Sequence, residues 1–151
     1  MKKIIAAFFI IVVLVSFFLI FKQSPAPETQ TFQSTPTPTS TSVNIKASFT
    51  IITENITRNF SAEKYHNQSS DVYIEKSDPS IVNVNKVGIT WSDFFKTLPM
   101  ELTKECLITG DGETLCTGQN GTLKFYLNNV ETPDLLDQEI TNDTKVSIIF
   151  K

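Results

Sequence analysis

An apolar segment at positions 4–21 most constrains what this chain can fold into, because Ser16 is the only polar residue among its eighteen. At about 1.5 Å per residue, eighteen helical residues are about 27 Å long, which is close to the thickness of the hydrocarbon core of a bilayer. A backbone in lipid must satisfy its own hydrogen bonds, and a helix does so. We therefore expect residues 1–22 to form a transmembrane anchor that contacts the lipid bilayer through residues 4–21.

The charges that flank this segment predict its orientation. Lys2 and Lys3 precede it and Lys22 follows it, and the side with more positive charge usually stays in the cytoplasm. We therefore expect a single-pass protein of the cell membrane, with a cytoplasmic N-terminus and an extracytoplasmic C-terminal domain. The alternative is a cleaved signal peptide. Its apolar region usually has only about 7–15 residues, and the nearest candidate cleavage sequence, residues 24–26, contains a proline.

The rest of the chain divides into two parts of different composition. In residues 23–42, fourteen of twenty residues are Pro, Ser or Thr, so we expect a disordered, extended linker that buries no core. Residues 43–151 contain ten Lys or Arg and fifteen Asp or Glu, a net charge of −5. Because this acidic domain lacks the basic clusters that bind phosphate backbones, we expect no nucleic-acid partner.

Alternation of apolar and polar residues predicts the first strand of this domain. Apolar residues occupy every second position of the range Val43–Ile51, which is the period of a strand with one buried face. Residues 53–70 are polar and irregular in pattern. Two further short strands are expected at Val72–Ile74 and Ile81–Val84, separated by a turn at residues 77–79.

One helix is expected after these strands. Four apolar residues follow the spacing i, i+3, i+4, i+7, which places them on one helical face. They are Trp91, Phe94, Phe95 and Leu98. Thr90 is expected to cap the N-terminus, with Asp93 as the acid of a capping box, and Pro99 ends the helix. Such an aromatic stripe is typical of core packing, and two turns of helix need a sheet to pack on.

The C-terminal third of the chain predicts more strands. Cys106–Ile108 and Thr114–Thr117 flank a glycine-containing turn, as in a hairpin. A strand is expected at Leu123–Leu127, followed by a turn at 128–129 and a short helical turn at 133–136. A last turn at 142–143 then leads into a strand at 146–150. The succession of strands, one helix and strands predicts an α+β fold, in which a mixed β-sheet carries one short packed helix.

Two stretches of this domain resemble known protein groups. Residues 123–150 are similar to the closing section of β-grasp (ubiquitin-like) domains. The stretch GITWSDFF at 88–95, with the paired cysteines and residues 124–128, resembles an uncharacterised group of small membrane-anchored proteins from candidate-phyla bacteria and archaea. The resemblance covers residues 70–151. It implies a β-grasp-like fold and a membrane-anchored topology, and no activity.

Two departures from these groups limit what the resemblance implies. Relatives carry histidines at the places that here hold Asn83 and Asn85, so a metal or proton role of those histidines does not carry over. The chain ends in residues 148–151 without Gly-Gly, so we expect no protein-modifier or sulfur-carrier role. It also lacks the four cysteines of a β-grasp ferredoxin cluster.

Cys106 and Cys116 are the only cysteines. The predicted hairpin brings its two strands within bonding distance, so we expect a disulfide. Such a bond persists in an oxidising compartment, which agrees with the predicted orientation. Free thiols are the alternative. A zinc site is not expected, because two Cys and one His leave its four positions incomplete.

Three other residues could carry chemistry. His66, the sole histidine, lies in a polar stretch that predicts an exposed loop. The spacing of Asp111 and Glu113 matches no calcium-binding loop, so we expect both to be ordinary polar residues of the glycine-containing turn. Five Asn-x-Ser/Thr sequences, which could accept glycans only where the machinery exists, begin at Asn55, Asn59, Asn67, Asn120 and Asn142.

These features favour a non-enzymatic, membrane-tethered binding module without metal or cofactor. Its partner would be another envelope protein or a surface ligand, bound at the edge or the open face of the sheet. One alternative is a small envelope enzyme or metal-dependent protein that uses His66, Asp111 and Glu113. Another is a structural accessory subunit of a membrane complex.

Overall fold

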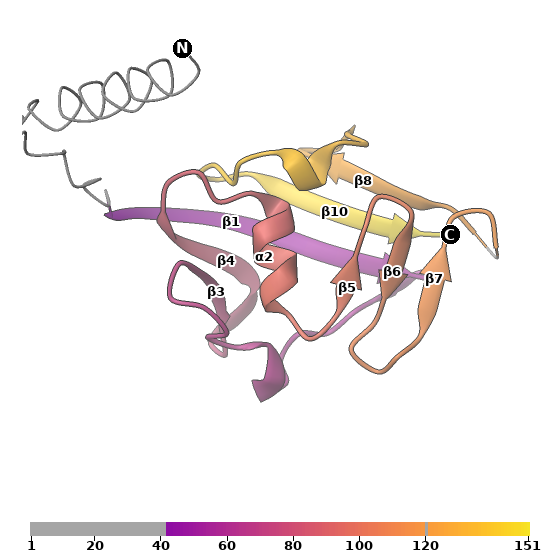
Figure 1. Cartoon of the computed structure of the whole chain (residues 1–151), viewed down its shortest axis with the longest axis horizontal. Coiled ribbons are helices and arrows are strands. Elements are labelled where there is room, and N and C mark those ends of the chain that lie inside the picture. The colour runs from indigo at the N-terminus through magenta and orange to yellow at the C-terminus, as the bar shows by residue number, and fades with distance from the viewer. Residues whose placement is uncertain (1–41, 120) are drawn as a thin grey trace, which may run out of the picture. The chain divides into compact units, whose positions relative to one another are not determined.

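A computed structural model describes residues 42–119 and 121–151 (Figure 1). The predicted anchor at 1–22, and the predicted linker up to residue 41, lie outside the described residues. Within the described part, no helix has the length and apolar character needed to cross a membrane.

The predicted mixed β-sheet with one short helix is confirmed. The large sheet has the strand order β3-β4-β1-β10-β8-β9, and β2 pairs with the end of β1. The two central strands β1 and β10 run parallel, and the other neighbours are antiparallel. The strand bounds are β1 Ser42–Thr53, β2 Ile56–Thr57, β3 Val72–Glu75, β4 Asp78–Lys86, β8 Leu123–Leu127, β9 Val130–Glu131 and β10 Lys145–Phe150.

The alternation in β1 determines which face of the sheet is buried. Ala47, Phe49, Ile51 and Thr53 are buried, while the residues between them are partly exposed. β10 repeats this pattern from Val146 to Phe150. One face of the sheet therefore packs on the core, and the other consists mostly of polar, partly exposed side chains.

The helix α2 (Trp91–Thr97) covers the buried face, as Figure 1 shows. Phe49 lies at the centre of this contact. Its ring centroid is 5.1 Å from that of Phe94 and 5.8 Å from that of Phe95 on the helix, and 4.9 Å from that of Phe60. The predicted apolar stripe is therefore core, and α2 owes its stability to this packing, since seven residues are too few for a helix stable alone.

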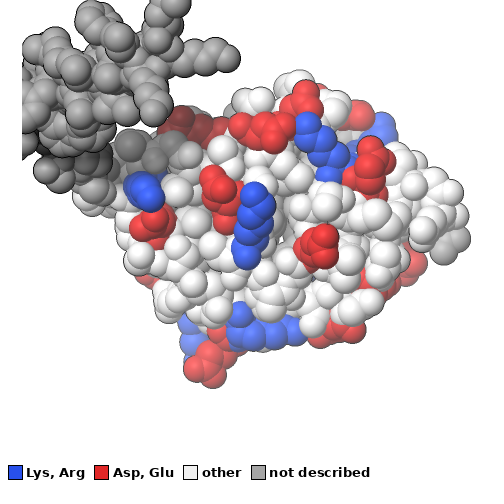
Figure 2. Space-filling model, in the orientation of Figure 1, with Lys and Arg blue, Asp and Glu red and all other residues white. Residues whose placement is uncertain are grey.

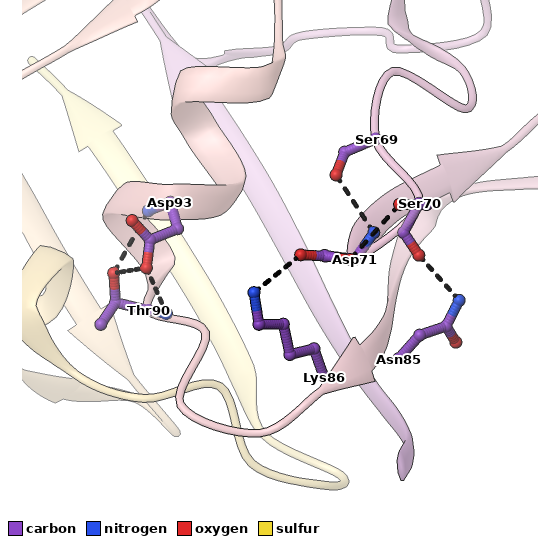
Figure 3. A network of polar contacts seen from close by, with 7 residues as sticks. All are labelled: Ser69, Ser70, Asp71, Asn85, Lys86, Thr90 and Asp93. Atoms are coloured by element: carbon purple, nitrogen blue, oxygen red, sulfur yellow. Dashed lines mark hydrogen bonds and ion pairs between the residues drawn. The ribbon is translucent and has the colours of Figure 1, made fainter. Parts of the chain in front are cut away.

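The predicted capping box begins the helix (Figure 3). The backbone N–H of Asp93 donates to Thr90 Oγ1 at 3.2 Å, and the backbone N–H of Thr90 donates to Asp93 Oδ2 at 3.0 Å. Beside it in Figure 3, Lys86 at the end of β4 forms an ion pair with Asp71, with 3.1 Å between Nζ and Oδ2. Asn85 Nδ2 donates to the carbonyl oxygen of Ser70 at 3.0 Å. These contacts hold the end of β4 where the chain turns into the helix.

Removing the cap should destabilise the domain measurably. Thr90→Ala is expected to lower the free energy of unfolding by about 1 kcal/mol, whereas Ser92→Ala, on the same turn but outside the box, should change it much less. Denaturant titration of both variants checks this. Equal losses in the two variants would contradict the assignment.

Asp93 gives the same box a pH dependence. Hydrogen bonds from the backbone and then the side chain of Thr90 lower the pKa of Asp93 below its ordinary value of 3.8. The stabilisation from this carboxylate is therefore complete above pH 3.8 and is lost as the pH falls through the lower folded value. The stability difference between the wild type and Asp93→Asn should shrink over that acidic range. A constant difference would show that ionised Asp93 contributes nothing.

A second, three-stranded sheet follows the helix and was not predicted from the sequence. It has the order β5-β6-β7, with bounds Glu101–Leu102, Cys106–Ile108 and Thr114–Cys116. The predicted hairpin is its β6–β7 pair, in which Cys106 lies directly opposite Cys116. The expected disulfide joins them, with 4.1 Å between the two Cα atoms. The bond cross-links β6 and β7, the two three-residue strands of this small sheet.

The remaining predicted turns are present. Asn128 and Asn129 have φ values of 50° and 69°, the left-handed conformation that a tight hairpin turn requires, and they connect β8 to β9. The short helical turn after Pro133 is η2 (Leu135–Asp137). Several boundaries differ by a few residues, most of all at β4, which begins at Asp78 and is preceded by a turn at residues 76–77.

Candidate functional site

The chain itself occupies part of each side of the large sheet, since a segment before β3 bonds that edge strand and the two-residue β9 and its neighbours cover part of β8. On the β3 edge, the carbonyl oxygen of Ile74 accepts a hydrogen bond from Asn67 N at 3.1 Å. On the β8 edge, the carbonyl oxygen of Phe125 accepts from Thr132 N at 2.8 Å, and Leu123 N donates to the hydroxyl of Thr117 at 3.0 Å. Backbone groups that are already paired cannot bind an added strand. The polar face of the sheet is therefore a better candidate for a ligand-binding surface than its edges.

Four polar side chains meet near the middle of that face. Lys46 and Ser48 are two residues apart on β1 and therefore point to the same side. Asn83 on β4 is paired in register with Lys46, and Lys145 on β10 is paired with Ser48. Directly opposed residues in a sheet have Cβ atoms only about 4.5–5.5 Å apart. We call these four residues the open-face quartet.

The quartet lines a hollow of about 490 Å³. An irregular register lies on one side of it, where the pairing of β3 with β4 jumps from Ile74↔Val82 to Glu75↔Asp78. The turn before β10 forms the opposite side. Besides the quartet, its lining comprises Ala47, Glu75, Ser77, Asp78, Ile81, Asp143 and Thr144.

Asn83 is the unusual member of the quartet. It lies between the buried Val82 and Val84, and only 9% of its surface is exposed. Its side-chain amide can make up to four hydrogen bonds, yet none joins it to another described residue, and its atoms are accessible from the hollow that it lines. Buried polar groups normally have partners, since an unpaired one destabilises the fold. Asn83 thus presents unused hydrogen-bonding capacity to the hollow.

Like Asn83, the two lysine side chains of the quartet have no partner within residues 42–119 and 121–151. Among the described residues, neither Lys46 nor Lys145 forms an ion pair, whereas most other cations do. Lys104, for example, bonds both Asp134 and Asp137, and these hydrogen bonds raise its pKa. On the helix side of the domain, Figure 2 accordingly shows basic and acidic residues interspersed.

The three carboxylates that line the hollow have local donors instead. Asp78 accepts from the hydroxyl of Ser80 at 2.7 Å, and Glu75 accepts from the hydroxyl of Ser77 at 3.2 Å. Asp143 accepts from the side-chain amide of Asn142 at 2.7 Å. The hollow therefore combines unpaired donors at its centre with carboxylates that retain some free lone pairs.

The prediction of an exposed His66 is wrong. The residue is 8% exposed, and its Nε2 donates to the carbonyl oxygen of Phe60 at 2.9 Å. The cause is tertiary packing, which the polar local sequence conceals. The short helical turn η1 (Glu63–Tyr65) places the ring of Tyr65 against Phe60, with centroids 5.1 Å apart, and draws His66 inward with it.

Asp111 and Glu113 lie on the β6–β7 turn, as expected, and bind the segment that contains η1. Asp111 accepts from Lys64 Nζ at 3.1 Å, which raises the pKa of Lys64, and Glu113 forms an ion pair with Arg58. His66 lines a different hollow from Asp111. The three residues of the alternative enzyme hypothesis are therefore not assembled into one site. Residues 42–119 and 121–151 contain no group of three His, Cys, Asp or Glu that could hold a metal ion.

Gly110 lets this turn approach the η1 segment closely. A Cβ atom there would lie 2.7 Å from the carbonyl oxygen of Pro99 and 2.9 Å from the Tyr65 hydroxyl. Gly110→Ala is therefore expected to lower the free energy of unfolding by about 1–3 kcal/mol, measured by denaturant titration. Asp111→Ala, which removes an exposed side chain and its ion pair with Lys64 from the same turn, should have a much smaller effect, because exposed ion pairs contribute little to stability. The reverse order would contradict this packing.

The Asn-x-Ser/Thr sequences differ in their surroundings. Asn55 and Asn67 are exposed and have positive φ, and Asn59 is exposed with its side-chain oxygen bonded to Ser61 N. Asn142 uses its side-chain oxygen to accept from Lys46 N at 3.0 Å. Asn120 lies outside the described residues.

Sequence reasoning did not identify the quartet as a site. Two signals were available: a polar residue between two valines in β4, and Lys46 and Ser48 on the polar side of the alternating strand. The register that joins them to Lys145 comes only from the fold. Comparison with known proteins adds no relationship, since no family model, curated protein or solved structure matches this chain.

Proposed function

We propose that this chain is a membrane-tethered, non-enzymatic binding module, and that its ligand lies on the open face of the large sheet. The observation that carries the proposal is the Asn83 side chain, which is 9% exposed, forms no hydrogen bond with another described residue, and lines a hollow of about 490 Å³ beside two lysines that form no ion pair within the described part of the chain. Unused hydrogen-bonding groups gathered in a concave surface are typical of a binding site. No such grouping surrounds His66, which bonds Phe60.

The strand order supports the β-grasp part of the resemblance. In the β-grasp fold, parallel central strands from the two ends of the domain are flanked by antiparallel neighbours, with a helix packed across one face. Here β1 and β10 are the parallel pair, β4 and β8 flank them, and α2 follows β4. The strand β3 and the disulfide-closed small sheet would be additions to that fold.

The disulfide and the apolar segment together support the proposed location. A bond between Cys106 and Cys116 is stable in an oxidising compartment, and residues 4–21 have the length of a membrane span. The proposal places the domain outside the cytoplasm, on a linker rich in Pro, Ser and Thr. At about 3.1 Å per extended residue, twenty such residues reach at most about 60 Å from the bilayer.

The proposal can be tested with the full-length chain purified in mild detergent. Delipidated envelope material from the source cells is immobilised, and retention of the chain is measured. We expect the wild type and Lys96→Gln to be retained, since Lys96 lies on α2 across the sheet. The double variant Lys46→Gln/Lys145→Gln should be washed out. Equal retention of the double variant, or no retention of the wild type, would refute a binding role for the open face.

A further inference from the structure

We infer that the open-face hollow binds a carboxylate-bearing saccharide unit, of the kind found in acidic surface polysaccharides. This inference rests on the proposed function and specifies its ligand. The open-face quartet supplies two ammonium groups, an amide and a hydroxyl within one hollow of about 490 Å³. The size suits one or two sugar rings.

The lysines define the charge of the ligand. Lys46 and Lys145 are both neighbours of Ser48, since Lys46 is two residues from Ser48 along β1 and Lys145 is paired with Ser48 across to β10. Both line the same hollow and form no ion pair with another described residue, so their ammonium groups are free to bind an anionic group of a ligand. The amide of Asn83, in register with Lys46, can donate to the same anion or accept from a neighbouring hydroxyl.

The carboxylates of the hollow distinguish a saccharide from an acidic peptide. Asp78 and Glu75 lie on one side and Asp143 on the other, and each accepts only one or two local hydrogen bonds. Ring hydroxyls can donate to their free lone pairs. An acidic peptide brings carboxylates without hydroxyls that could donate to these three. The combination of lysines and carboxylates in the lining therefore fits a ligand in which each unit carries one carboxylate together with several hydroxyls.

The lining predicts the character of the binding. Ile81 is its only large apolar residue, and no aromatic ring lines the hollow. Affinity must therefore come from hydrogen bonds and charge, which salt weakens at an exposed site. We expect weak binding that decreases as the ionic strength rises.

The test uses the full-length chain in detergent and three probes: a galacturonic acid trimer, its methyl ester, and a triglutamate peptide. Calorimetric titration should show binding of the acid trimer, with affinity at least about tenfold lower for the ester and for the peptide. Lys46→Gln and Lys145→Gln should each weaken trimer binding by about tenfold, and Lys96→Gln should leave it unchanged. The side-chain amide resonances of Asn83 should shift with the acid trimer.

Each contrary result has a distinct meaning. Equal binding of the ester would show that the carboxylate is not recognised, and equal binding of the peptide would show that the ring is not recognised. Either result overturns the saccharide assignment, as does absence of trimer binding. If the envelope retention described above still depends on Lys46 and Lys145, the binding module stands and only its ligand was misassigned. If that dependence is also absent, both proposals fail.

Discussion

Phe49→Ala is expected to lower the free energy of unfolding by about 3–5 kcal/mol, the usual effect of removing a buried aromatic ring. Phe49 is 2% exposed, and its ring contacts Phe94 and Phe95 of α2 as well as Phe60. The substitution would leave a cavity where the helix, the sheet and the segment before η1 meet. Denaturant titration, with the fluorescence of Trp91 as the signal, measures the loss, since Trp91 is the single tryptophan and is fully buried beside the helix contact.

The neighbouring residue is the matched control. Thr50 follows Phe49 in β1 but lies on the polar face, so Thr50→Ala should change the free energy of unfolding by about 0.5 kcal/mol or less. If Phe49→Ala lost no more than this control, the central packing of the helix on the sheet would be wrong.

Opening the disulfide is expected to have the second largest effect. Cys106 and Cys116 are separated by ten positions, and closing a loop of this length restrains the unfolded chain by about 2–3 kcal/mol. The free energy of unfolding should fall by this amount when the wild type is titrated in reductant. The small sheet should lose its order first, because its three strands comprise only two or three residues each.

The double variant Cys106→Ser/Cys116→Ser provides the control for this measurement. It should match the reduced wild type, and reductant should not affect it further. An unfolding midpoint that reductant leaves unchanged in the wild type would mean that the bond is absent or contributes nothing to stability.

Local patterns in the sequence predicted most of the large sheet and its helix. The alternation in β1 and β10 and the aromatic stripe of α2 each repeat with the period of one element, so they can be recognised without knowledge of the fold. The capping box and the Asn128-Asn129 turn also depend on neighbouring residues alone. The disulfide followed from the predicted hairpin.

Features that depend on contacts between distant segments could not be predicted in this way. The strand β5 has only two residues, too few to show a period. His66 is buried because Tyr65 packs on Phe60, which a polar sequence does not indicate. The open-face quartet combines three strands, and its members meet only because β1 pairs with β4 on one side and with β10 on the other.

The most direct test of the account asks on which side of the membrane the domain lies. Intact, unreduced cells that produce the full-length chain are treated with a thiol-alkylating reagent, and the chain is then recovered and its length and labelling are determined by mass spectrometry. We predict a chain that retains residues 1–22, with Cys106 and Cys116 both unlabelled until a reductant is added. A chain that begins after residue 22, or two cysteines alkylated without reductant, would contradict it.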